Sequence, residues 1–121
     1  FNFSLREIPS AIQAVMQNAA YSATTTDALI LHQANKFIIE SIAQKTGFTK
    51  LQAPSGAVEK YGNQSSASIP CVLIDSLSND LSKKSLRLVG CGFGVGLSWA
   101  AFAGEMGPLV IVPIQSLPVT P

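Results

Sequence analysis

The stretch Ala28-Leu29-Ile30-Leu31-His32-Gln33-Ala34-Asn35 decides the fold class of this 121-residue chain. Its first four residues form an apolar run that is typical of a buried strand. Asn35 can cap a helix over residues 36–46, which Gly47 ends. His32 is the only histidine, and it follows the strand directly. It therefore lies where open α/β sheets usually present their chemistry.

The remaining hydrophobic pattern adds elements on both sides of this stretch. Helical spacing predicts helices over residues 8–20, with Pro9 in the first turn, and over residues 66–77, with a short helical turn over residues 57–61. Alternating or continuous apolar runs predict strands over residues 1–5, 86–89, 97–103 and 109–114. We expect a polar linker over residues 78–84 and a loose tail over residues 118–121. This order predicts one layered α/β domain over residues 1–121.

The composition excludes several classes of function. Charged residues are 12% of the chain, well below the share in a typical soluble domain, and the net charge is +1. We therefore expect no nucleic-acid partner. Because no apolar run reaches the ~18–20 residues that span a bilayer, we also expect no membrane partner. Apolar residues are 47% of the chain, which indicates a surface that another protein part covers.

The cysteines, Cys71 and Cys91, could form one disulfide, but nothing else in the sequence indicates secretion. We expect two buried free thiols in a cytosolic protein. We expect no metal site and no cofactor.

A second polar segment, Tyr61-Gly62-Asn63, precedes Gln64-Ser65-Ser66 and predicts a turn into the next helix. A histidine and an asparagine on two such loops can direct two hydrogen-bond donors at one oxygen. That arrangement stabilises negative charge that develops on a carbonyl. Taken alone, His32 is more often structural, and Asn63 is more often a turn residue.

A third segment, at residues 92–99, contains Gly92, Gly94 and Gly96. It does not fit a dinucleotide-binding loop, because Leu97 occupies the place of the last glycine and a strand follows instead of a helix. A tight turn between two strands is the simpler interpretation.

Together, the three segments resemble the carboxyl-terminal half of a β-ketoacyl-acyl-carrier-protein synthase III, of the thiolase superfamily. They are His32-Gln33-Ala34-Asn35, residues 61–70 (YGNQSSASIP) and residues 92–99 (GFGVGLSW). The resemblance covers residues 1 to about 103. It implies one half of a thiolase-like αβαβα sandwich, with the nucleophilic cysteine in an amino-terminal half that this chain lacks. The chain begins with Phe1 and looks like a piece of a longer protein, so we expect it to be inactive alone.

The resemblance also implies an activity and its residues. Members of the family condense an acyl thioester with a malonyl-carrier protein in fatty acid or related biosynthesis. By matching motif, His32 and Asn63 bind the thioester carbonyl of the malonyl donor and stabilise the enolate that decarboxylation leaves. His32 would donate from a neutral ring, with its other nitrogen held as an acceptor. The backbone amide of Val95 would form the oxyanion hole, and Asn35 would help to hold the pantetheine arm.

Partners follow from the same resemblance. We expect the acyl-carrier protein, CoA thioesters, the chain's own amino-terminal half and a second copy in a homodimer, all in the cytoplasm.

This sequence departs from the family pattern at three places. Gln64 stands where threonine is common, Val95 where a third consecutive glycine is common, and Phe37 where an arginine is typical. A positive φ at Val95 would strain a β-branched residue. Two alternatives therefore stay open. One is a non-catalytic module that binds or dimerises, and the other is an acyltransferase that does not decarboxylate.

Overall fold

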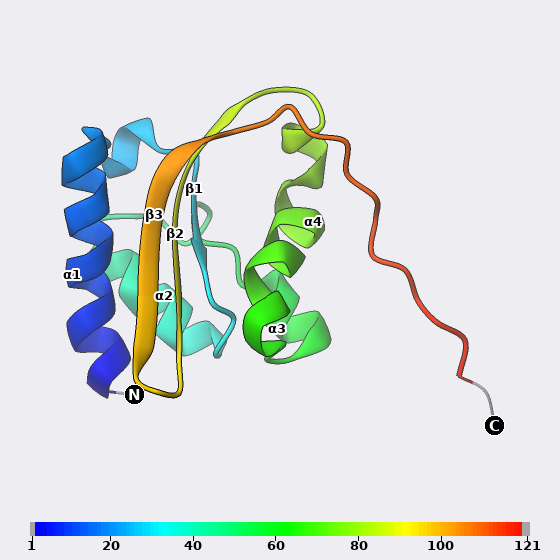
Figure 1. Ribbon diagram of the computed structural model, residues 1–121, viewed down its shortest axis with the longest axis horizontal. Coiled ribbons are helices and arrows are strands. Elements are labelled where there is room, and N and C mark those ends of the chain that lie inside the picture. Colours follow the sequence, from blue (N-terminus) through cyan, green and yellow to red (C-terminus); the bar gives the residue numbers. More distant parts are fainter. Residues whose placement is uncertain (1, 120–121) are drawn as a thin grey trace.

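The computed structural model describes residues 2–119 and contains helices on both faces of a three-stranded sheet (Figure 1). The elements in chain order are α1 (Asn2–Ala19), η1 (Ala23–Thr25), β1 (Ala28–Leu31), α2 (Lys36–Lys45), α3 (Gly56–Tyr61), η2 (Ser65–Ala67), α4 (Ser68–Leu81), β2 (Leu86–Gly94) and β3 (Ser98–Met106). The expected layered α/β class is therefore confirmed. Within residues 2–119, no helix is long and apolar enough to cross a membrane.

The sheet has the order β1-β2-β3 and mixes two kinds of pairing. β1 runs parallel to β2, with Ala28 opposite Leu88 and Leu31 opposite Cys91. β2 pairs antiparallel with β3, with Gly94 opposite Ser98 at the hairpin end. Because β1 and β2 are parallel, their carboxyl ends meet at one edge of the sheet. The loop after β1 and the β2–β3 hairpin therefore come together at that edge.

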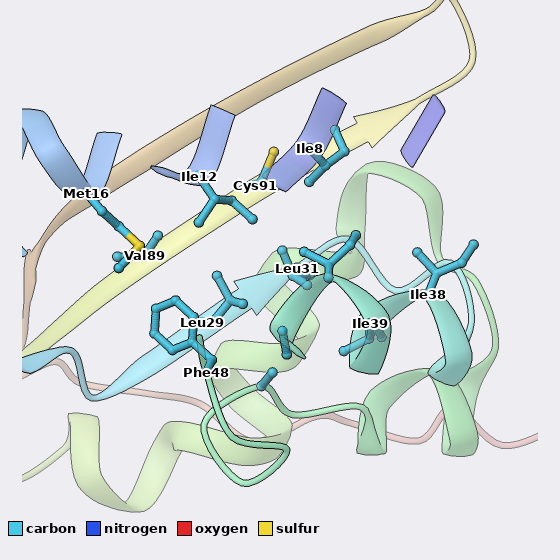
Figure 2. Close-up of a cluster of buried hydrophobic side chains, with 13 residues drawn as sticks. Ile8, Ile12, Met16, Leu29, Leu31, Ile38, Ile39, Phe48, Val89 and Cys91 are labelled. Atoms are coloured by element: carbon cyan, nitrogen blue, oxygen red, sulfur yellow. The ribbon is translucent and has the colours of Figure 1, made fainter. Parts of the chain in front are cut away.

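β1 is buried on both faces, which explains its continuous apolar sequence. Leu29 and Leu31 face α1 and α2, in the cluster of side chains drawn in Figure 2. Ala28 and Ile30 face the opposite layer, in a second cluster with residues of α3, α4 and β2. Burying a large aliphatic side chain contributes about 1.5–3 kcal/mol, so this short strand anchors both layers.

The expected strand over residues 1–5 is wrong for residues 2–5, which form the first turns of α1, while Phe1 lies outside the described residues. Ser4, Ile8, Ile12 and Met16 are all buried and recur every four residues. This stripe continues helical spacing through Pro9, which lies inside the helix and not in its first turn. Proline removes one backbone donor, and here burial of the stripe outweighs that loss.

Four expectations in the second half of the chain also need correction. Residues 78–81 continue α4 instead of forming a linker, because Leu81 is fully buried. β2 extends five residues beyond the predicted end at residue 89, and β3 reaches Met106. The expected strand over residues 109–114 does not form. The Leu109 N–H donates to the Leu81 carbonyl at 2.7 Å and Ile111 packs against the α3/α4 cluster, so this segment follows α4 and not a sheet edge.

The other helices agree with the sequence. α2 and α3 form where expected, and the Asn35 side chain caps α2 by accepting from the Ile38 N–H at 2.9 Å. Gly47, just beyond α2, has φ +86°, as a glycine that ends a helix commonly does. Of the predicted tail, residues 118–119 have no regular structure, and residues 120–121 lie outside the described part.

Candidate active site

A pocket of about 710 Å³ lies at the edge where β1 and β2 end. The loop after β1, the turn into α4, the β2–β3 hairpin and the start of α1 all contribute to its wall. It contains three of the four residues singled out from the sequence, His32, Asn63 and Val95. Phe3 of α1 also lines the pocket and packs edge-on against Trp99 at 5.1 Å between ring centroids.

His32 is held by both its backbone and its ring. Its N–H donates to the Cys91 carbonyl at 3.0 Å, which continues the pairing of β1 with β2. The imidazole lies edge-on to Phe93, with 5.3 Å between ring centroids and an interplanar angle of 82°. Partial burial lowers the pKa of His32 from its ordinary value, and a hydrogen bond that the ring donates to the backbone of Ser65 opposes this shift in part. His32 is therefore mainly neutral at neutral pH.

Asn63 is fixed by the turn that it begins. Its Oδ1 accepts from the Ser65 N–H at 2.9 Å, the local bond by which asparagine stabilises turns. Gly62 and Ser65 both have positive φ, +74° and +52°. This bond fixes the side chain with its amide oxygen turned to Ser65, and the NH₂ group is then its hydrogen-bond donor. Ser65 thus contacts both His32 and Asn63 through its backbone.

Val95 lies at the tip of the β2–β3 hairpin with its side chain fully exposed. The strain expected from a positive φ does not arise, because Val95 is not among the described residues with positive φ. The neighbouring Gly96 takes φ +146° instead. The turn therefore accepts the valine without forcing it into a left-handed conformation.

Asn35 does not line this pocket; its side-chain oxygen caps α2. Its neighbour Ala34 does line it.

Gln33 is a structural residue of the site to which the sequence assigned no role. Its side chain is completely buried. Its Nε2 donates to the carbonyls of Leu31 and Pro54 at 3.0 and 3.3 Å, and its Oε1 accepts from the Val58 N–H at 3.1 Å. These bonds tie the His32 loop to the start of α3. A glutamine beside the only histidine was the available signal, but two of its three partners, Pro54 and Val58, lie more than twenty residues away.

Neither cysteine lies in the pocket wall. Cys71 and Cys91 are both free and buried, as the sequence predicted. Burial raises the pKa of the Cys91 thiol to about 11, and burial also raises the pKa of Cys71. Both therefore stay protonated at neutral pH and are poor nucleophiles. Among residues 2–119, no group of three or more histidine, cysteine or acidic side chains gathers as metal ligands would.

Comparison with known proteins gives consistent matches. The family model for the carboxyl-terminal part of 3-oxoacyl-[acyl-carrier-protein] synthase III matches residues 16–106. β-Ketoacyl-[acyl-carrier-protein] synthase III of Lactococcus lactis is 39% identical over 101 residues, which are 82% of this chain and 31% of that protein. The chloroplastic protein of the same name from Arabidopsis thaliana is 36% identical over 84% of this chain and 25% of its own length.

Two solved structures share the fold over 93% of this chain. The 3-oxoacyl-(acyl-carrier protein) synthase of Burkholderia xenovorans has a TM-score of 0.88 at 38% identity, and the chain covers 32% of it. The 3-oxoacyl-(acyl carrier protein) synthase III of Pseudomonas aeruginosa has a TM-score of 0.81 at 26% identity, with 34% covered. The chain thus spans about a third of the length of these proteins, and its fold is one part of theirs.

Proposed function

This chain belongs to the 3-oxoacyl-[acyl-carrier-protein] synthase III family, whose carboxyl-terminal domain it matches, and from that membership we propose a function for its pocket. The chain supplies the donor-activating part of a condensing enzyme that joins an acyl thioester to a malonyl thioester with loss of carbon dioxide. The observation that carries this proposal is the placing of His32 and Asn63 in one pocket, with the Asn63 amide oriented to donate.

The chemistry requires donors at one oxygen. When a malonyl thioester loses carbon dioxide, the electron pair of the broken C–C bond moves into the thioester and places negative charge on its oxygen. Donors that are held in position before the reaction stabilise this enolate, and deleting one such donor commonly lowers kcat by about 10²–10³. In our proposal the Asn63 NH₂ and the His32 ring supply these donors. The Val95 backbone N–H then donates to the acyl oxygen, which becomes negatively charged when the enolate attacks the acyl group.

Partners follow from the size of the match. Because the chain spans about a third of the length of its relatives, we place the acyl-carrying cysteine in an amino-terminal half that packs against this chain. The complete protein then forms a homodimer. The substrates are thioesters of the acyl-carrier protein and of CoA. Asn35 helps to hold the pantetheine arm of these substrates beside Ala34. We propose the cytoplasm as the compartment, although the Arabidopsis relative is a chloroplastic protein by name.

The direct test is carbon dioxide release from malonyl-CoA and malonyl-carrier protein by the full-length protein that carries this chain. We expect release with both donors, and the chain alone should release none. If the full-length protein folds and loads an acyl group but releases no carbon dioxide, the decarboxylating function is wrong. An acyltransferase that does not decarboxylate would then be favoured.

A further inference from the structure

The start of α4 presents a hydroxyl that no contact within residues 2–119 satisfies. Ser68 is the first residue of this helix, lines the pocket of His32 and Asn63, and is 1% exposed. Its Oγ has no hydrogen-bond partner in the described part of the chain. Burying a hydroxyl without a partner costs free energy, and such a group in a pocket wall points to a ligand that completes its bonding.

The helix end around Ser68 favours a negatively charged ligand. α4 has 14 residues, its N-cap residue Ala67 makes no side-chain capping bond, and its first turn carries no acidic residue. The positive end of the helix dipole is therefore not offset by a carboxylate of its own first turn. No lysine, arginine, aspartate or glutamate lines the pocket, so the donors available to an anion there are neutral.

A second buried side-chain atom without a partner lies nearby in the sequence but does not fit an anion. Gln64 Oε1 also lacks a hydrogen-bond partner within the described residues. It is an acceptor, and Gln64 is not part of the pocket wall. Of the two unpaired groups, only the Ser68 hydroxyl can donate to a ligand in this pocket.

We propose that Ser68 binds the free carboxylate of the malonyl-type donor, with its Oγ–H donating to one carboxylate oxygen. This inference rests on the proposed function. The thioester oxygen of the same molecule then lies at His32 and Asn63, across the pocket. When the C–C bond breaks, its electron pair moves to the enolate and the carboxylate leaves as neutral carbon dioxide. A neutral donor suits this step, because a cation would bind the charged ground state more tightly than the transition state.

The test compares two half-reactions in the full-length protein. Ser68→Ala removes the hydroxyl and leaves the rest of the helix intact. We expect its KM for malonyl-CoA in carbon dioxide release to rise at least about tenfold, as for a lost hydrogen bond to a charged group. The rate of acyl loading and the melting temperature should not fall, because no bond within the described chain is lost. Ser68→Cys, which keeps a weaker donor, should give an intermediate KM.

The matched control is Ser76→Ala, the same substitution at an exposed position of the same helix and away from the pocket. It should leave both half-reactions unchanged. An unaltered KM in Ser68→Ala would overturn the carboxylate site while leaving the proposed function in place, provided that the unsubstituted protein releases carbon dioxide. Equal slowing of acyl loading and of carbon dioxide release would make Ser68 structural and also overturn it. If the unsubstituted protein releases none, the proposed function fails and this inference fails with it.

Discussion

At the scale of single residues, Ser65 organises the candidate site although it supplies no side chain to the proposed chemistry. Its N–H orients the Asn63 amide at 2.9 Å, and its backbone also bonds to His32. A positive φ of +52° at Ser65 places these groups. The Asn63 amide is thus oriented by backbone geometry before any substrate binds, which is the condition for electrostatic stabilisation of an enolate.

His32 gives this chain a predictable dependence of stability on pH. Its pKa in the folded state is lowered from the ordinary value of 6.5, chiefly by burial. Between the folded-state pKa and pH 6.5, the unfolded chain therefore binds more protons at His32 than the folded chain does. The free energy of unfolding should fall as the pH drops through that value towards the folded-state pKa, and His32 should contribute nothing above it. Urea unfolding between about pH 5 and 8 measures this.

The control for this prediction is His32→Asn, because no other histidine is present. The variant should lose the His32 part of the pH slope. Identical slopes in the two proteins would show that His32 has the same pKa folded and unfolded.

Asn35 allows the capping and binding functions of one residue to be separated. Asn35→Ala removes the bond to the Ile38 N–H and should cost about 1 kcal/mol of unfolding free energy. Asn35→Ser keeps a capping oxygen and should be close to the original stability. If Asn35 also holds the pantetheine arm, both variants of the full-length protein should raise the KM for malonyl-CoA. A normal KM in Asn35→Ser would restrict Asn35 to capping.

At the scale of elements, Gly90 of β2 lets the neighbouring strands β1 and β3 pack closely around it. A Cβ at this position would collide with the Phe102 ring and lie 2.9 Å from the Ile30 carbonyl oxygen. Since that oxygen belongs to the backbone of a buried strand, it cannot move aside. We expect Gly90→Ala to lower the free energy of unfolding by about 1–3 kcal/mol, as measured by chemical denaturation.

Gly104 provides the comparison, because it lies in the adjacent strand β3 and a Cβ there would meet nothing within 4 Å. Gly104→Ala should be neutral or slightly stabilising. Equal losses in both variants would mean that strand flexibility, and not the collision at Phe102, determines the effect.

The elements that were predictable are those with local signals. The apolar run before His32, the Asn35 cap and Gly47 together defined β1 and α2 closely. The strand expected at residues 1–5 failed because short alternation there competes with a stripe that becomes visible only over four turns. The apolar run at residues 109–114 has strand composition, but it pairs with no strand of the described sheet, and the Leu109 N–H instead donates to the Leu81 carbonyl at the end of α4.

The site divides in the same way. The sequence motifs predicted His32, Asn63 and Val95 as site residues, and all three line one pocket. Gln33 and Ser65 act through long-range or backbone hydrogen bonds that no local pattern encodes.

At the scale of the whole molecule, the chain leaves large apolar side chains uncovered. Leu97 and Trp99 at the hairpin are 64% and 42% exposed, and Val110 and Val112 in the final segment are more than half exposed. Such a surface is typical of a part that docks on another. We expect the isolated chain to self-associate, as measured by light scattering over a concentration series.

Substituting Leu97→Lys together with Val110→Lys should weaken this association, because both side chains are exposed and their loss leaves the core intact. A monomer at every concentration for the original chain would contradict the expectation that these surfaces are covered in the complete protein.

The central claim is that His32 and Asn63 stabilise the enolate of a malonyl donor. The most direct measurement follows both half-reactions of the full-length protein in His32→Ala and Asn63→Ala, with Ser76→Ala as control. Each of the first two should lower carbon dioxide release from malonyl-CoA by about 10²–10³, while acyl loading stays at the rate of the control. Carbon dioxide release that survives both substitutions, or acyl loading that falls in parallel, would contradict the account.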